Sequence, residues 1–137
     1  MTRPDLTRIL TEHLAALNGG DLERLVSFYS EDAVLELPAS PKVEGRAAIR
    51  RAFEVFLEQW DEHSAYDHVL ASGTTAAVEG VTTGRHRTLH LRIPGRVPTT
   101  ARQYRHAFAA FFTFRGGKIV RQRVYYDARD LVKQLLG

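Results

Sequence analysis

The sequence contains no cysteine, so neither disulfide bonds nor thiol chemistry can contribute to its stability or function. It also contains no apolar run that approaches the ~20 residues needed to span a membrane, so we expect no membrane partner. No apolar stretch precedes the first charged residues. We therefore expect no signal peptide and a cytoplasmic location.

Acidic residues are missing from a long internal stretch of the chain. Between Glu79 and Asp127 there is no aspartate or glutamate. The same stretch holds ten basic residues: Arg85, Arg87, Arg92, Arg96, Arg102, Arg105, Arg115, Lys118, Arg121 and Arg123. This basic half could bind nucleic acid, attract an anionic ligand, or form a solvated or self-association face. No glycine-aromatic RNA-binding signature accompanies the arginines, which disfavours nucleic acid.

At 137 residues the chain is long enough for one domain with a buried core, so we treat residues 1–137 as a single domain. Helical spacing of apolar residues predicts helices over residues 4–18, 22–29, 46–60 and 128–136. Alternating patterns predict strands over residues 33–37, 64–72 and 76–93, with residues 30–32 as a turn. Asp127 precedes the last predicted helix, and a helix cap explains it better than a catalytic carboxylate does.

Two long strands are predicted from Thr100 to Asp127, joined by Gly116 and Gly117. Glycine adopts positive φ without strain, so this pair predicts the turn of an antiparallel hairpin. A three-residue loop from Arg115 to Gly117 keeps each face of the hairpin uniform, whereas a two-residue loop mixes the faces. We therefore predict pairing of Phe112 with Val120, Ala110 with Gln122, Phe108 with Val124 and His106 with Tyr126.

The inner face of this hairpin is apolar, with His106, Gln122 and Tyr126 set into it and Tyr104 at its open end. A dry concave face with a few polar groups is typical of a small-molecule pocket. The alternative is an ordinary core in which these groups bond to backbone. His13, on the apolar side of the first helix, and Trp60, at the end of the third, are likewise either core residues or pocket wall.

A metal site is not expected, and no cofactor is predicted. His86 and His90 have a spacing that suits zinc on a helix. Their β-branched neighbours and Pro94 predict a strand instead, where four residues span about 13 Å. That separation is too large for both side chains to bind one ion.

Two segments carry a family resemblance: LAALNGGDLERLVSFYSEDAVLELP near the start and GGKIVRQRVYYDARDLVKQLLG at the end. With the order of elements, they resemble the SnoaL-like family, which is grouped with nuclear transport factor two, ketosteroid isomerase and limonene epoxide hydrolase. The resemblance covers nearly the whole chain. It implies an α+β fold in which a cone-shaped, curved antiparallel or mixed sheet wraps around three N-terminal helices (a cystatin-like roll), with a short C-terminal helix. It also implies an internal pocket and a homodimer formed through the outer sheet face.

The resemblance also indicates which catalytic residues this chain lacks. Ketosteroid isomerases use a tyrosine as oxyanion donor, an aspartate as general base and a protonated acid as second oxyanion donor. The corresponding positions in this chain are His13, Leu37 and Ala110. Polyketide cyclases and epoxide hydrolases have an aspartate at the position that corresponds to Val124. The hydrolases also have an arginine and an aspartate on an earlier strand, and these correspond to Gly80 and Thr82. The catalytic acids of all three groups are therefore expected to be absent. The polar groups left inside are expected to be neutral: His13, Tyr104, His106, Gln122 and Tyr126.

Three functions stay open on this basis. The first is binding of a hydrophobic small molecule, with an anionic one as an alternative, by His13, Trp60, Tyr104, His106, Phe108, Gln122, Val124 and Tyr126. The second is isomerase- or cyclase-type acid–base catalysis, with His106 transferring the proton and His13 donating a hydrogen bond to a ligand oxygen. The third is a non-catalytic, dimeric assembly domain, which a pocket closed by Phe108, Phe112 and Trp60 would favour.

Overall fold

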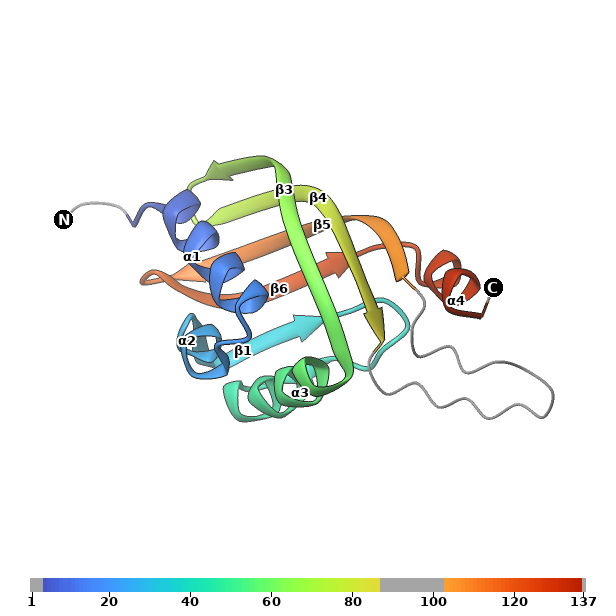
Figure 1. Ribbon diagram of the computed structural model, residues 1–137. Coiled ribbons are helices and arrows are strands. Elements are labelled where there is room, and N and C mark those ends of the chain that lie inside the picture. The colour runs from blue at the N-terminus through green and yellow to red at the C-terminus, as the bar shows by residue number, and fades with distance from the viewer. Residues whose placement is uncertain (1–3, 87–102, 137) are drawn as a thin grey trace.

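The computed structural model describes residues 4–86 and 103–136. Its main element is one curved sheet of six strands (Figure 1). Its strands are β1 (Tyr29–Glu36), β2 (Val43–Glu44), β3 (Trp60–Ser72), β4 (Thr75–His86), β5 (Gln103–Arg115) and β6 (Lys118–Tyr125). They lie in the order β2-β1-β6-β5-β4-β3. β1 runs parallel to β6 and all other neighbours are antiparallel, so the sheet is mixed.

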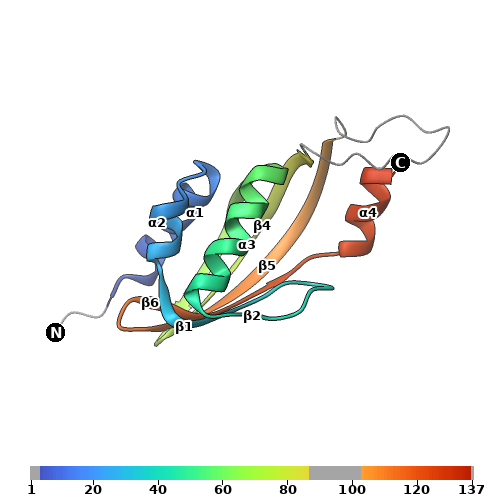
Figure 2. The same cartoon turned by 90° about the horizontal axis from the view of Figure 1, so that it is seen from below.

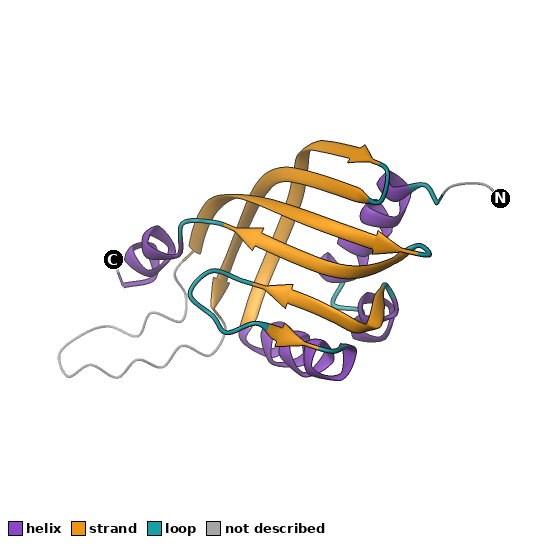
Figure 3. Cartoon of the chain, turned by 180° about the vertical axis from the view of Figure 1, so that it is seen from behind, coloured by secondary structure: helices purple, strands orange, loops and turns teal. Residues whose placement is uncertain are grey.

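Three helices cover one face of this sheet: α1 (Leu6–Asn18), α2 (Leu22–Ser27) and α3 (Arg46–Gln59) (Figure 2). Figure 3 shows the opposite face, in front of which no described helix lies. The short helix α4 (Ala128–Leu136) is separate from these three helices and lies at the end of the sheet where β6 ends and β5 begins. The predicted α+β fold, with three N-terminal helices on a curved sheet and a short C-terminal helix, is confirmed.

Aspartate side chains begin three of the helices. Asp5 and Asp21 accept from the backbone N–H of Arg8 and Arg24, at 3.1 and 3.2 Å. Asp127 Oδ1 accepts from the Asp130 N–H at 2.9 Å. Each carboxylate thereby satisfies a helical N–H that has no backbone partner. Asp127 is therefore the structural cap that its spacing predicts.

The hairpin register differs from the predicted one. Gly116 and Gly117, with φ of 58° and 77°, form a two-residue turn, and Arg115 pairs with Lys118. Ile119 then pairs with Phe114 while Arg121 pairs with Thr113, which leaves Val120 as the extra residue of a β-bulge.

Because of this bulge, the inward-facing residues of β5 again lie opposite inward-facing residues of β6. Beyond it Phe112 lies opposite Gln122 and Ala110 opposite Val124. The prediction was wrong because it allowed only regular pairing, whereas a tight turn followed by a bulge gives the same apolar inner face. As a consequence Ile119, which is fully buried, takes the core position that was predicted for Val120.

Two strand boundaries also differ from prediction. α2 ends at Ser27 and β1 begins at Tyr29, so residues 30–32 belong to a strand and not to a turn. β3 begins at Trp60 and not at residue 64, because Trp60, Asp61 and Glu62 pair with β4. The end of the strand predicted over residues 76–93, including His90, lies outside the described residues.

The core lies between the helices and the concave face of the sheet. Its fully buried large side chains come from both layers: Leu10, His13, Leu25, Tyr29, Ile49, Phe112 and Ile119. None of the helices in the described part of the chain is long and apolar enough to cross a membrane.

Candidate functional site

A cavity of about 270 Å³ lies between the concave face of the sheet and helices α1 and α3, with α4 contributing Leu131. Its wall is mainly aliphatic and aromatic. Seven of the predicted site residues line it: His13, Trp60, His106, Phe108, Gln122, Val124 and Tyr126. Tyr104 is not part of this lining but lines a separate groove at the end of β4 and the start of β5, where it contacts the cavity residues Glu62, Trp60 and His106.

At the inner end of the cavity, two lining residues, His13 and Gln122, form a hydrogen-bonded group with the buried side chain of Tyr29. The Tyr29 hydroxyl donates to Gln122 Oε1, and His13 Nε2 lies 2.9 Å from the Tyr29 oxygen. Because the hydroxyl hydrogen is used on Gln122, His13 must donate from Nε2. Its other nitrogen, Nδ1, then carries a lone pair.

His13 Nδ1 is buried and has no hydrogen-bond partner among the described residues. The ring is packed edge-on against Phe28, Tyr29 and Phe112, at centroid distances of 5.6 to 5.7 Å. Burial without a counter-charge lowers the pKa of His13 to about 4. The residue is therefore neutral near pH 7 and presents an acceptor, whereas the sequence suggested a donor to a ligand oxygen.

The outer end of the cavity holds a carboxyl group, Glu62 on β3. Its Oε2 accepts a hydrogen bond from the hydroxyl of Tyr104, a residue on β5 that is only 3% exposed. Burial raises the pKa of the Glu62 carboxyl, and the bond from Tyr104 partly opposes this shift. Both burial and the nearby Glu62 charge raise the pKa of Tyr104. An ionisable acid therefore lines a cavity whose polar groups were expected to be neutral.

Sequence reasoning missed Glu62 because the patterns predict a helix that ends at residue 60 and a strand that begins at residue 64, which leaves residues 61–63 in a loop. The alternation that places Ser64 and Tyr66 on the inner face continues backwards to Glu62 and Trp60, and all four line the cavity. That period-2 pattern is the signal that could have found the residue.

Space for the Glu62–Tyr104 pair depends on Gly84 of β4. A Cβ atom at this position would lie 2.9 Å from Glu62 Cγ, 2.9 Å from the Tyr104 hydroxyl and 2.6 Å from the carbonyl oxygen of Asp61. All three separations are below van der Waals contact. The glycine thus allows the carboxyl and the phenol to meet.

Tyr104, the hydrogen-bond partner of this carboxyl group, belongs to a series of aromatic rings in contact with one another. Trp60 packs edge-on against Tyr104 at 5.7 Å between centroids, and Tyr104 stacks on His106 at 6.0 Å. His106 stacks on Tyr126 at 4.8 Å. We call these four rings the aromatic wall. Burial lowers the pKa of His106, so its imidazole is neutral near pH 7.

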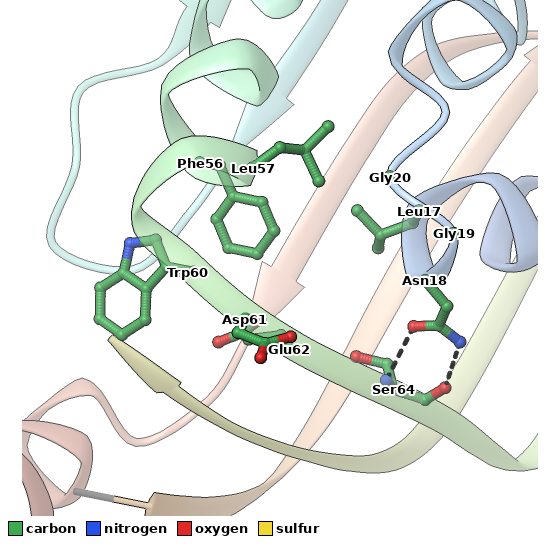
Figure 4. Close-up of a pocket in the computed structure, with 10 residues that line it drawn as sticks. All are labelled: Leu17, Asn18, Gly19, Gly20, Phe56, Leu57, Trp60, Asp61, Glu62 and Ser64. Atoms are coloured by element: carbon green, nitrogen blue, oxygen red, sulfur yellow. Dashed lines mark hydrogen bonds between the residues drawn. The ribbon is translucent and has the colours of Figure 1, made fainter. Parts of the chain in front are cut away.

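A smaller cleft of about 210 Å³ adjoins the cavity at the C-terminal ends of α1 and α3 (Figure 4). It shares Leu17, Phe56, Trp60, Glu62 and Ser64 with the cavity. The amide of Asn18 and the backbone of Ser64 exchange two hydrogen bonds of 2.9 Å, which fix the end of α1 to β3. Glu62 therefore lies where the cavity and the cleft meet.

No group of three metal-ligating side chains occurs within residues 4–86 and 103–136. His86 packs edge-on against Trp60, with 4.3 Å between the ring centroids, and does not line the cavity.

Comparison with known proteins gives one family and one fold. The model of the SnoaL-like domain matches residues 10–122. A candidate polyketide cyclase from Xanthomonas campestris pv. campestris superposes with a TM-score of 0.84 and 26% identity, over 95% of this chain and 96% of that one. A candidate polyketide cyclase from Pseudomonas putida KT2440 has a TM-score of 0.84 and 25% identity, over 96% and 98%.

A more distant structure agrees in fold alone. An LEH-like epoxide hydrolase from M. tuberculosis has a TM-score of 0.75 and 18% identity, over 96% of this chain and 89% of that one. No protein of curated function matches the sequence. The match to the family model and the agreement in fold lead to one conclusion: the chain belongs to the SnoaL-like domain family.

Proposed function

We propose that this protein binds a hydrophobic small molecule in the cavity between the sheet and helices α1 and α3. The observation that carries the proposal is an apolar cavity of about 270 Å³ with polar groups at its two ends, His13 inside and Glu62 outside. An apolar cavity of about 150 Å³ holds benzene, so this one suits a ligand larger than a single ring. A non-catalytic assembly domain would be favoured by an interior that Phe108, Phe112 and Trp60 close, so the presence of a cavity disfavours that alternative.

A thermal-shift screen with apolar ring compounds tests this proposal. A ligand at 100 times its dissociation constant stabilises the fold by about 2.7 kcal/mol, which raises the melting temperature measurably. Val124→Phe places a phenyl ring in the cavity, so we expect this variant to melt near the wild-type temperature and to lose the shift. Val55→Phe makes the same change on the exposed side of α3 and should keep it. A shift that survives in Val124→Phe would contradict binding in the cavity.

Acid–base catalysis is a second candidate, supported by the 25–26% identity to two candidate polyketide cyclases. His106 and Glu62 line the cavity and both can exchange a proton. In D₂O, exchange of the acidic C–H protons of a cyclic 1,3-diketone, followed by NMR, reports such transfer. We expect catalysed exchange in the wild type and a loss of at least about tenfold in His106→Ala. Exchange at the buffer rate in both proteins would remove this candidate.

We further propose that the uncovered sheet face binds a second copy of the chain. Successive cross-strand pairs run across this face: Leu70 pairs with Ala77, Ala77 with Phe111, and Phe111 with Arg123. Tyr125 packs edge-on against Phe111 at 6.2 Å, and the Arg123 guanidinium lies 5.9 Å from the Phe111 ring centre. We call Leu70, Ala77, Phe111 and Tyr125 the outer patch. Large apolar side chains gathered on one face are typical of an interaction site.

A further inference from the structure

Glu62 is the single acidic side chain in the described lining of the cavity, and no lysine or arginine lines it. The basic residues described in the second half of the chain, such as Arg115, Arg121 and Arg123, lie outside this lining. When Glu62 is ionised, the cavity therefore carries a net negative charge. This sign is opposite to the one an anionic ligand would need.

The Glu62 charge has no cationic partner among the described residues. Its hydrogen bond comes from the neutral phenol of Tyr104, and within residues 4–86 and 103–136 no lysine, arginine or histidine is paired with it. Even a partly buried carboxylate is costly without a counter-charge, and the raised pKa of Glu62 reflects that cost. A bound cation would offset it.

The aromatic wall is suited to a cation as well. Trp60, His106 and Tyr126 line the same cavity as Glu62, and Tyr104 connects Trp60 to His106. The faces of tryptophan and tyrosine rings attract ammonium groups. Glu62 also lines the adjoining cleft (Figure 4), and we expect a charged group to reach it from there.

We propose that the ligand of this cavity is a hydrophobic amine whose ammonium group pairs with Glu62 and lies against the aromatic wall. The apolar part of the amine occupies the cavity towards Phe108 and Val124. Tyr104 positions the carboxyl by its hydrogen bond, and Gly84 leaves room for that bond. This inference rests on the proposed function, because it assigns the ligand class of the same cavity.

Three probes of nearly equal shape test the charge preference: 2-aminoindane, 2-indanol and indane-2-carboxylate. Binding is measured by calorimetry and by the fluorescence of Trp60, the single tryptophan of the chain. We expect the wild type to bind the amine at least about tenfold more tightly than the alcohol, and the carboxylate least tightly.

Matched variants then assign the preference to Glu62. Glu62→Gln keeps an acceptor for Tyr104 but removes the charge, so the amine and the alcohol should bind equally. Glu58→Gln removes one charge from the exposed side of α3 and should keep the wild-type preference. Trp60→Leu should reduce the preference without abolishing it. Melting temperatures of all variants confirm that they are folded.

The outcomes separate the two proposals. If the alcohol binds as tightly as the amine in the wild type, or if Glu62→Gln keeps the preference, the amine assignment is wrong while binding in the cavity stands. If none of the three indanes binds, the amine assignment is wrong, and the thermal-shift screen decides separately whether the cavity binds another hydrophobic molecule.

Discussion

His13 shows how one residue can be placed correctly by sequence and still have a different chemical role. Its position on the apolar side of α1 predicts burial, and it is 1% exposed. As a donor to a ligand oxygen His13 would need a free ring N–H, but its Nε2 lies 2.9 Å from the Tyr29 hydroxyl oxygen. The apolar spacing predicts Tyr29 at the end of a helix, so the sequence alone does not indicate that the two side chains meet.

The buried His13 predicts a loss of stability in mild acid. In the folded protein its pKa is about 4, against 6.5 for an exposed histidine, so between these values only the unfolded chain takes up the proton. The free energy of unfolding should therefore decrease as pH falls from 6.5 to 4, by about 3 kcal/mol in total from this residue. Urea denaturation at a series of pH values measures this slope.

The variant His13→Gln is the control, because an amide does not titrate. Other groups titrate in the same range, but they are common to both proteins, so the difference between the two pH curves isolates His13. Parallel curves from pH 6.5 to 4 would show that His13 is protonated equally easily in both states. The absolute stability of the variant does not enter this comparison.

Glu62 is the cavity residue that the sequence analysis did not predict. The predicted site residues come from alternation along the hairpin, which is a local signal. Glu62 enters the cavity because β3 continues to Trp60, and that continuation depends on pairing with the distant residues Gly84 and His86. The charge of the cavity is thus set by a long-range pairing.

At the scale of single elements, helices were easier to predict than strand pairing. The apolar spacing of α1 and α3 fixes their buried faces, and their ends lie within two residues of prediction. The pairing of β5 with β6 depends on one extra residue, Val120, which no local pattern marks. A bulge alters which residues face each other without altering the alternation that predicts the strands.

The capping of α4 gives a prediction at this scale. Asp127 satisfies the Asp130 N–H, and α4 packs Leu131 and Leu135 against Tyr104. We expect Asp127→Ala to lower the free energy of unfolding by about 1 kcal/mol, and Asp127→Asn, which keeps an acceptor, to lower it by less. Chemical denaturation of the three proteins at neutral pH measures both values. Equal stabilities of Asp127→Ala and the wild type would mean that α4 does not need this cap.

At the scale of the whole molecule, the outer patch predicts the oligomeric state. We expect the protein to sediment as a dimer at micromolar concentration. Phe111→Glu places a charge at the centre of the patch, which is 42% exposed at this residue, and should produce a monomer with an unchanged circular dichroism spectrum. Sedimentation velocity distinguishes the two states.

Val132→Glu is the matched control for the outer patch. It introduces the same charge at an exposed apolar residue of α4, on another part of the surface, and should leave the dimer intact. A wild-type protein that sediments as a monomer at high micromolar concentration would contradict self-association through this face.

The parallel pairing of β1 with β6 has a consequence for synthesis of the protein. β1 comes early in the chain, yet the strand that joins it to β5, β4 and β3 is the last to be made. A growing chain therefore carries the apolar sides of α1 and α3 before the sheet that covers them is complete. We expect such nascent chains to need protection by chaperones, and the domain to fold only once β6 has been made.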